Sequence, residues 1–336
     1  MNILLTGGTG YIGSHTAVVL SQAGHEVVLL DNFCNSSPSV LDRLEKILGK
    51  ALPCIEADVR ETEVVEKVLR EYKIDAVIHF AGLKAVGESN AKPVEYYANN
   101  VQGTISLLLA MSAVGVKTLV FSSSATVYGD PQYLPIDENH STNPTNPYGR
   151  TKLQIEEILR DLSNSDPGWK IICLRYFNPV GAHESGLIGE DPNGLPNNLM
   201  PYIAQVAAGK LPHLNVYGDD YPTADGTGVR DYIHVMDLAE GHLASLHYAQ
   251  NHFGWAVFNL GVGKGYSVLD VIKTYEEVNG KKISVCVALR RSGDIAACFS
   301  RAEKAKEFMG WFARRDLDEM CSSSWKHAKN IYKDSK

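Results

Sequence analysis

A short apolar run passes directly into a glycine-rich turn in ILLTGGTGYIG, the sequence of residues 3–13. Gly8, Gly10 and Gly13 fit the pattern GxGxxG, whose glycines let the backbone of a strand-to-helix turn approach a pyrophosphate. Asp31 lies 18 residues after Gly13, at the end of the next apolar run, where a carboxylate can accept hydrogen bonds from an adenosine ribose. An ordinary strand-to-helix connection also fits the glycines alone, but this context favours a bound dinucleotide.

The charge near Asp31 indicates which dinucleotide would bind. Asp31 would repel the 2′-phosphate of NADP, and residues 32–35 contain no arginine that could receive that phosphate. We therefore expect NAD as the cofactor.

Apolar runs typical of strands alternate with helix-like segments through the first half of the chain. Strands are expected at residues 3–5, 27–30, 52–56, 76–80, 118–121 and 171–174, and helices at 14–23, 61–72, 99–114 and 148–164. Such alternation predicts parallel strands with helices on both faces, joined by right-handed crossovers. The expected fold class is α/β, with a doubly wound parallel Rossmann sheet and a smaller mixed α/β domain for the substrate.

The second half of the chain differs in composition, which sets the expected domain boundary. Residues 179–198 are rich in Gly, Pro and Asn, as in an irregular loop, and short mixed helices and strands follow. We expect residues 1–178 to form the NAD-binding domain and residues 179–336 the substrate domain. Segments near 230–262 could return to the first domain, because residues 257–261 could add a strand to its sheet.

Net charge and cysteine spacing exclude several functional classes. The 32 Lys and Arg residues are outnumbered by 39 Asp and Glu residues, which gives a net charge of −7 and argues against nucleic acid or an anionic membrane as a partner. No apolar run approaches the roughly 20 residues of a membrane-spanning helix, and the N-terminus lacks the features of a signal peptide. The six cysteines show no metal-ligand spacing. We expect a cytoplasmic protein without a metal.

Tyr148 and Lys152 lie four residues apart at the start of a predicted helix, on one face. A phenol with a pKa of about 10 is a poor base at neutral pH, but a nearby ammonium group lowers that pKa. The pair could therefore remove a hydroxyl proton while a hydride leaves the same carbon. On its own this spacing is ordinary for a surface helix. It gains weight from Ser122–Ser124, which end a predicted strand at the edge where open α/β sheets bind ligands.

These motifs together resemble the extended short-chain dehydrogenase/reductase family, through residues 6–13, Asp58, Asn99, Ser122–Ser124 and the Tyr148/Lys152 pair. Longer segments look like the UDP-glucose 4-epimerases of that family: HFAGLKAVGES at 79–89, RYFNPVGA at 175–182, PNNLMPY at 196–202 and DGTGVRDYIHV at 225–235. The resemblance extends from residue 1 to about residue 325.

The resemblance implies an isomerase that interconverts UDP-galactose and UDP-glucose, as in galactose metabolism, without net redox change. Tyr148 would take the proton of the sugar 4′-hydroxyl while NAD takes the C4′ hydride, the 4-keto sugar would turn about its pyrophosphate, and the hydride would return to its other face. Ser124 would hold the 4′-oxygen, and Lys152 would bind the nicotinamide ribose and tune Tyr148.

The resemblance also assigns the binding residues. Those for NAD are Gly7, Gly10, Tyr11, Ile12, Gly13, Asp31, Asn32, Asn35, Ser36, Asp58, Val59, Phe80, Ala81, Gly82, Lys84, Asn99, Ser122, Tyr148, Lys152 and Phe177. Those for the UDP-sugar are Ser124, Tyr148, Asn178, Asn198, Leu199, Asn215, Val216, Tyr217, Arg230, Arg291, Asp294 and Cys298.

Two positions narrow the implied substrates. Ala125-Thr126 stands where related 4,6-dehydratases carry an Asp-Glu pair, so elimination of water is disfavoured. In the family, a tyrosine at the position of Cys298 restricts the pocket to unacetylated sugars, and a small residue resembles the bifunctional members. We therefore expect activity on UDP-GalNAc and UDP-GlcNAc as well. The alternative is that Cys298 is only a small apolar core residue.

Other interpretations stay open. A decarboxylase of UDP-glucuronate from the same family would yield a product without C6, and a non-catalytic NAD-binding regulator would not need Ser124, Tyr148 and Lys152 together. Family resemblance also implies a homodimer, for which the segments 99–114 and 148–164 are candidate contacts.

We expect His79 to be a hydrogen-bonded core residue. We expect the basic C-terminus to be a solvated, fraying helix, with Lys326, His327, Lys329, Lys333 and Lys336.

Overall fold

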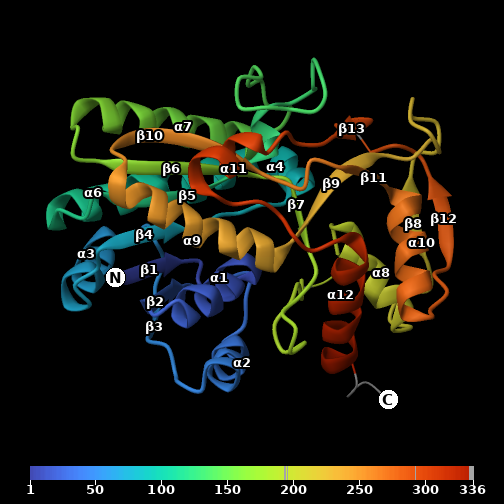
Figure 1. Cartoon of the computed structure of the whole chain (residues 1–336), viewed down its shortest axis with the longest axis horizontal. Coiled ribbons are helices and arrows are strands. Elements are labelled where there is room, and N and C mark those ends of the chain that lie inside the picture. The colour runs from blue at the N-terminus through green and yellow to red at the C-terminus, as the bar shows by residue number, and fades with distance from the viewer. Residues whose placement is uncertain (193, 195, 292, 333–336) are drawn as a thin grey trace.

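Seven parallel strands form the main sheet, in the spatial order β10-β6-β5-β4-β1-β2-β3 (Figure 1). The computed structural model describes residues 1–336 except 193, 195, 292 and 333–336. The strands are β1 (Asn2–Thr6), β2 (Glu26–Asp31), β3 (Cys54–Glu56), β4 (Ala76–His79), β5 (Thr118–Ser124), β6 (Lys170–Tyr176) and β10 (Gly254–Leu260). This sheet confirms the predicted doubly wound α/β fold.

Alternate residues of β1 serve two apolar cores, one on each face of the sheet. Ile3 and Leu5 pack in one core with α1 (Tyr11–Gln22), α2 (Ser39–Leu48), α9 (Val235–Asn251) and α11 (Glu303–Met309). Leu4 packs in the other with α3 (Thr62–Glu71), α6 (Gln102–Val114) and α7 (Pro147–Ser165). Successive side chains of a strand point to opposite faces. The unbroken apolar run at the N-terminus therefore belongs to a strand that is covered on both sides.

Some helices differ from the sequence prediction. The helix expected at 99–114 begins as a π-helical turn at Tyr97–Val101 and continues as α6. The prediction lacks α2, α4 (Val86–Ala91) and α5 (Pro93–Tyr96). The last two are too short for a helical period to show, and α2 follows the Asn- and Ser-rich residues 32–37, which resemble a loop.

A smaller lobe, at the right of Figure 1, follows the main sheet. One of its sheets joins β7 (Asn178–Val180), β9 (Val229–His234), β11 (Gly265–Ser267) and β13 (Ala297–Cys298), and another pairs β8 (Leu214–Tyr217) with β12 (Val285–Ala288). Its helices α8 (Leu199–Ala207), α10 (Val268–Asn279) and α12 (Leu317–Ile331) enclose a third apolar core. Between β9 and β11 the chain returns to the main sheet as α9 and β10, and β10 pairs with β6 over seven residues.

The C-terminal helix corrects one expectation. α12 packs against α8 and α10 through Trp325 and Ala328, and His327 is buried rather than solvated. Its ring lies so close to Gly189 that a Cβ there would approach it to 2.4 Å. Lys326 and Lys329 are exposed as expected, and Lys333 and Lys336 lie outside the described residues. Within the described ranges, no helix combines the length and apolar character that a bilayer crossing requires.

Candidate active site

The glycine turn between β1 and α1 forms a cradle made of backbone. Gly7 has a φ of +69°, and a Cβ on it would lie 2.7 Å from the backbone nitrogen of Ala81. A Cβ on Gly13 would lie 2.4 Å from the Gly7 carbonyl oxygen. α1 then begins at Tyr11, and its first turn contains no acidic residue. The N–H groups of such a first turn can bind an anion, so the cradle fits the pyrophosphate of a dinucleotide.

Asp31 ends β2 beside this cradle and is buried. Its carboxylate accepts hydrogen bonds from the backbone of Thr9 (3.0 Å) and Phe33 (2.9 Å) and from the hydroxyl of Ser36 (3.2 Å). A carboxylate has about four acceptor positions. Asp31 is therefore held rigidly with capacity left for a ribose hydroxyl.

Asp58 lies close to the same edge of the sheet. It accepts from Asn32 Nδ2 at 3.0 Å and from Arg60 at 2.8 Å through both Nε and Nη2. Hydrogen bonding to the Arg60 side chain lowers the pKa of Asp58 to about 2. Sequence reasoning did not single out Arg60, because an arginine two residues after an aspartate has no distinctive pattern.

Ser124, Tyr148 and Lys152 meet at the carboxyl ends of the strands. α7 begins at Pro147, and the side chain of Asn146 caps it by accepting from Gly149 N at 2.9 Å. Lys152 is buried and its Nζ donates to the Ser122 carbonyl at 2.6 Å, 5.9 Å from the centre of the Tyr148 ring. Ser124 ends β5, and its hydroxyl accepts from the backbone of Thr126 at 3.2 Å.

The electrostatics of this trio differ from the sequence expectation. Burial raises the pKa of Tyr148, and hydrogen bonding to the Ser124 hydroxyl partly offsets the rise. Burial also lowers the pKa of Lys152 to about 8, which the charge of Glu156 counteracts. A net lowering of the Tyr148 pKa is therefore not seen, because desolvation of the phenol dominates. The Lys152 ammonium group is also engaged by the Ser122 carbonyl.

Besides Ser124 and Tyr148, the residues assigned to the UDP-sugar include two groups in the smaller lobe. Arg230 on β9 and Cys298 on β13 are paired neighbours, and Arg230 Nη1 donates to the Val229 carbonyl at 2.8 Å. Elsewhere Arg291 donates from Nε to Asp294 at 2.8 Å and lies 4.8 Å from the centre of the Tyr217 ring.

Other predicted residues are placed less directly. Val59 and Val216 are buried in apolar cores, and Leu199 is partly buried against one of them. Asn35 is exposed, and Asn215 lies on β8 next to Val216. Asn99 lies in the π-helical turn. Its neighbour Asn100, which sequence reasoning missed, binds the Leu83 backbone and the Thr151 hydroxyl.

Glu190, which was not predicted, links Lys84, a residue expected to bind NAD, to Asn198, a residue expected to bind the UDP-sugar. Its Oε1 accepts from Asn198 Nδ2 at 2.6 Å and lies 3.3 Å from Lys84 Nζ. Lys84, expected to bind NAD, pairs with a carboxylate here. The link spans 106 residues of sequence between Lys84 and Glu190, so no local pattern reveals it.

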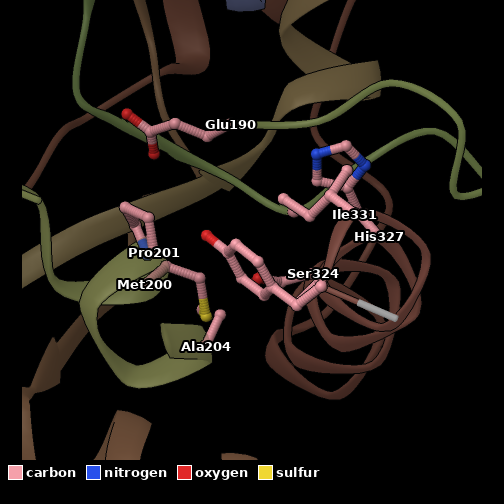
Figure 2. A pocket seen from close by; sticks show the side chains of 10 residues that line it. Glu190, Met200, Pro201, Ala204, Ser324, His327 and Ile331 are labelled. Carbon is pink, nitrogen blue, oxygen red and sulfur yellow. The ribbon is translucent and has the colours of Figure 1, made fainter. Parts of the chain in front are cut away.

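A small cavity lies behind Glu190, between α8 and α12 (Figure 2). Its lining includes Glu190, Met200, Pro201, Ser324 and His327, and its volume is about 10 Å³. That volume suits a single water molecule. The cavity is therefore too small for a sugar or a nucleotide.

His79, in β4, is a core residue as expected, with hydrogen bonds to Thr6 and Thr104. No group of metal-ligating residues occurs in the described part of the chain.

Comparisons with known proteins agree with this geometry. Residues 3–261 match the NAD dependent epimerase/dehydratase family. The chain is 59% identical to a UDP-glucose 4-epimerase of Bacillus subtilis over 326 residues, which cover 97% of this chain and 96% of the relative. It is similar to the crystal structure of a UDP-glucose 4-epimerase from Bifidobacterium longum in complex with NAD+ and UDP, with a TM-score of 0.95, 54% identity and 98% of both chains covered. For such an enzyme from Stenotrophomonas maltophila with bound NAD and formylated UDP-arabinopyranose, the TM-score is 0.97, with 50% identity and 99% of both chains covered.

Proposed function

The chain belongs to the NAD dependent epimerase/dehydratase family, and we propose that it interconverts UDP-glucose and UDP-galactose by inverting C4 of the sugar. The meeting of Ser124, Tyr148 and Lys152 at the carboxyl edge of the main sheet carries this proposal. Relatives that share more than half of their residues with this chain support it.

The cradle and Asp31 would hold NAD, with residues 1–178 as its domain. NAD held there would supply the acceptor and the donor for the hydride of the sugar C4. Tyr148 takes the proton of the 4′-hydroxyl and gives it back, and Ser124 orients that oxygen with its hydroxyl. Lys152 supplies positive charge beside Tyr148, which favours the phenolate against the effect of burial.

Residues 179–336, apart from α9 and β10, would hold the UDP-sugar. Arg230 and Arg291 would bind the diphosphate, because a guanidinium can donate two parallel hydrogen bonds to its oxygens. Arg291 uses Nε and Nη2 on Asp294, so its Nη1 edge can turn to the ligand. After oxidation at C4, the 4-keto sugar would turn about its pyrophosphate and present its other face.

The same site would accept N-acetylated UDP-sugars. Cys298 is partly buried and packs against a cluster that contains Val127, Tyr128 and Phe177. Its thiol is much smaller than the tyrosine that the resemblance associates with unacetylated sugars. A 2-acetamido group needs such space.

A homodimer through α6 and α7 is part of the proposal. Ile105 and Leu109 of α6 are 42% and 59% exposed, as expected for apolar residues that a second subunit covers. Light scattering on the purified protein tests this state, and a monomer at micromolar concentration would contradict it.

The activity is tested by incubating the purified protein with UDP-galactose, without added NAD, and separating the sugar nucleotides. UDP-glucose should appear, because the cofactor remains bound through purification. No conversion by protein that contains NAD would contradict the proposal. Loss of C6 from UDP-glucuronate would instead indicate a decarboxylase.

A further inference from the structure

α7 presents two buried charges, one helical turn apart, to the end of β5. Lys152 Nζ donates to the carbonyl of Ser122 at 2.6 Å, and the hydroxyl of Ser123 donates to Glu156 Oε1 at 2.5 Å. The two side chains therefore hold consecutive residues of β5, directly before Ser124. Residues four apart on a helix are neighbours on one face, so both charged side chains extend from the same face of α7 to adjacent residues of β5.

Arg175 of β6 fixes Glu156 from the other side. Its Nε lies 3.0 Å from Oε1 and its Nη2 lies 2.6 Å from Oε2, and the two side chains are only 5% and 3% exposed. The guanidinium also lies 4.8 Å from the centre of the Tyr128 ring. Burying an ion pair carries a large desolvation cost, so apolar residues of similar volume often stabilise a fold equally well. The position of the pair beside the Tyr148/Lys152 site points to a role there.

The other titratable groups around these charges are neutral. Burial lowers the pKa of His79 on β4 to about 3, and it raises the pKa of Cys173 on β6 well above its usual value. Burial likewise raises the pKa values of Tyr128, which follows β5, and Tyr148, on α7. Of the groups named here, Glu156 and Arg175 alone bring charge to Lys152.

We propose that Glu156 is a positioning residue that acts through Lys152: held by Arg175 and Ser123 one helical turn away, its negative charge keeps the ammonium group charged beside Tyr148. This role rests on the proposed epimerase function. It also explains why a buried acid stands one turn beyond the Tyr-x-x-x-Lys pair, where no contact with the sugar is required. Lys152 has a pKa lowered by burial, which the negative charge of Glu156 opposes.

The test is the pH dependence of kcat/KM for UDP-galactose in Glu156→Gln, which keeps the volume and removes the charge. The alkaline limb, where Lys152 loses its proton, should move to lower pH by about one unit. Glu156→Asp should bring the limb back toward the wild-type position. A lower rate at every pH with an unmoved limb would overturn the proposal, because that is what damaged packing alone would produce.

Arg175→Lys provides the matched control, since it disturbs the two-point contact with Glu156 but keeps both charges. Its limb should stay in place, and a shift to lower pH like that of Glu156→Gln would overturn the proposal. If Glu156→Gln does not fold, the limb of Glu156→Asp decides: it should stay near the wild-type position, and a shift to lower pH would count against the role.

A second readout does not require turnover. The ultraviolet absorbance difference between the holoenzyme and its Tyr148→Phe variant measures ionised Tyr148 as pH rises. In the Glu156→Gln variant, the ionised fraction of Tyr148 should depart from its wild-type dependence on pH at the pH where Lys152 loses its charge. A titration curve equal to that of the wild type would contradict the proposal. A wild-type protein that does not convert UDP-galactose would contradict the epimerase function instead.

Discussion

The cofactor half of the proposed site is built mainly from backbone, whereas the sugar half is built mainly from side chains. In the cofactor half, the backbone lies so close to Gly7 and Gly13 that a single added methyl group would collide with it. In the sugar half, Arg291 and Asp294 of one short segment form an ion pair, and Arg291 also contacts the ring of Tyr217 on β8. The first half should therefore be sensitive to added volume, and the second to the identity of a side chain.

The largest effect is expected at the junction of the two halves. Tyr148→Phe removes the group that moves the proton, so kcat should fall by about 10²–10⁴-fold while NAD stays bound. Sugar-nucleotide separation measures the first quantity and cofactor absorbance the second. Tyr133→Phe, at an exposed tyrosine, is the control. Wild-type activity in the Tyr148 variant would show that neither half works as proposed.

Cys298→Tyr tests the sugar half. The added ring should reduce turnover of the N-acetylated pair by roughly 10–200-fold and leave UDP-galactose turnover nearly unchanged. The matched control is Cys286→Tyr, at an exposed cysteine on β12. Assays of both substrate pairs decide the outcome, and an equal loss on both would show that Cys298 does not select between them.

Gly13→Ala tests the cofactor half. Its methyl group would meet the Gly7 carbonyl at 2.4 Å, and backbone cannot turn aside as a flexible side chain can. We expect a loss of about 1–3 kcal/mol in unfolding free energy and less NAD per protein. Chemical denaturation and cofactor absorbance measure both. Gly87→Ala is the control, because a Cβ there meets no atom within 4 Å, and equal behaviour of the two variants would refute the tight cradle.

The smallest expected effect is the change in unfolding free energy with pH that each buried histidine near the two halves of the site contributes. Burial lowers the pKa values of His15, His79 and His234 to about 3, so each is neutral in the folded protein and binds protons more readily when unfolded. Stability should therefore fall as pH drops below about 6.5, by roughly 1 kcal/mol per histidine at pH 5.5. Denaturation midpoints between pH 5 and pH 8 measure it. His15→Gln should flatten the slope more than His247→Gln, at an exposed histidine, and equal slopes would contradict this assignment.

The contrast between the halves also explains what the sequence could predict. The cradle lies within eleven consecutive residues, and Tyr148 and Lys152 are separated by one helical turn, so local patterns reveal both. Glu190 meets Lys84 and Asn198 only because distant segments fold together. The same holds for Asn100, which joins the backbone after β4 to α7.

Sequence patterns also could not predict how burial and the nearby ammonium group together set the pKa of Tyr148. Spacing places the ammonium group near the phenol, and it does not report the cost of burying either group. Helices α4 and α5 escaped prediction for a different reason, since six and four residues cannot display a helical period.

The return of the chain to the main sheet as β10 has a consequence for biosynthesis. β6 pairs with β5 on one side and, among the described strands, with β10 on the other, and β10 emerges from the ribosome after most of the chain. A nascent or prematurely terminated chain that ends before Gly254 leaves seven residues of β6 with unpaired backbone groups, an edge that invites aggregation. The enzyme therefore depends on its last quarter to close the sheet that its first residues begin.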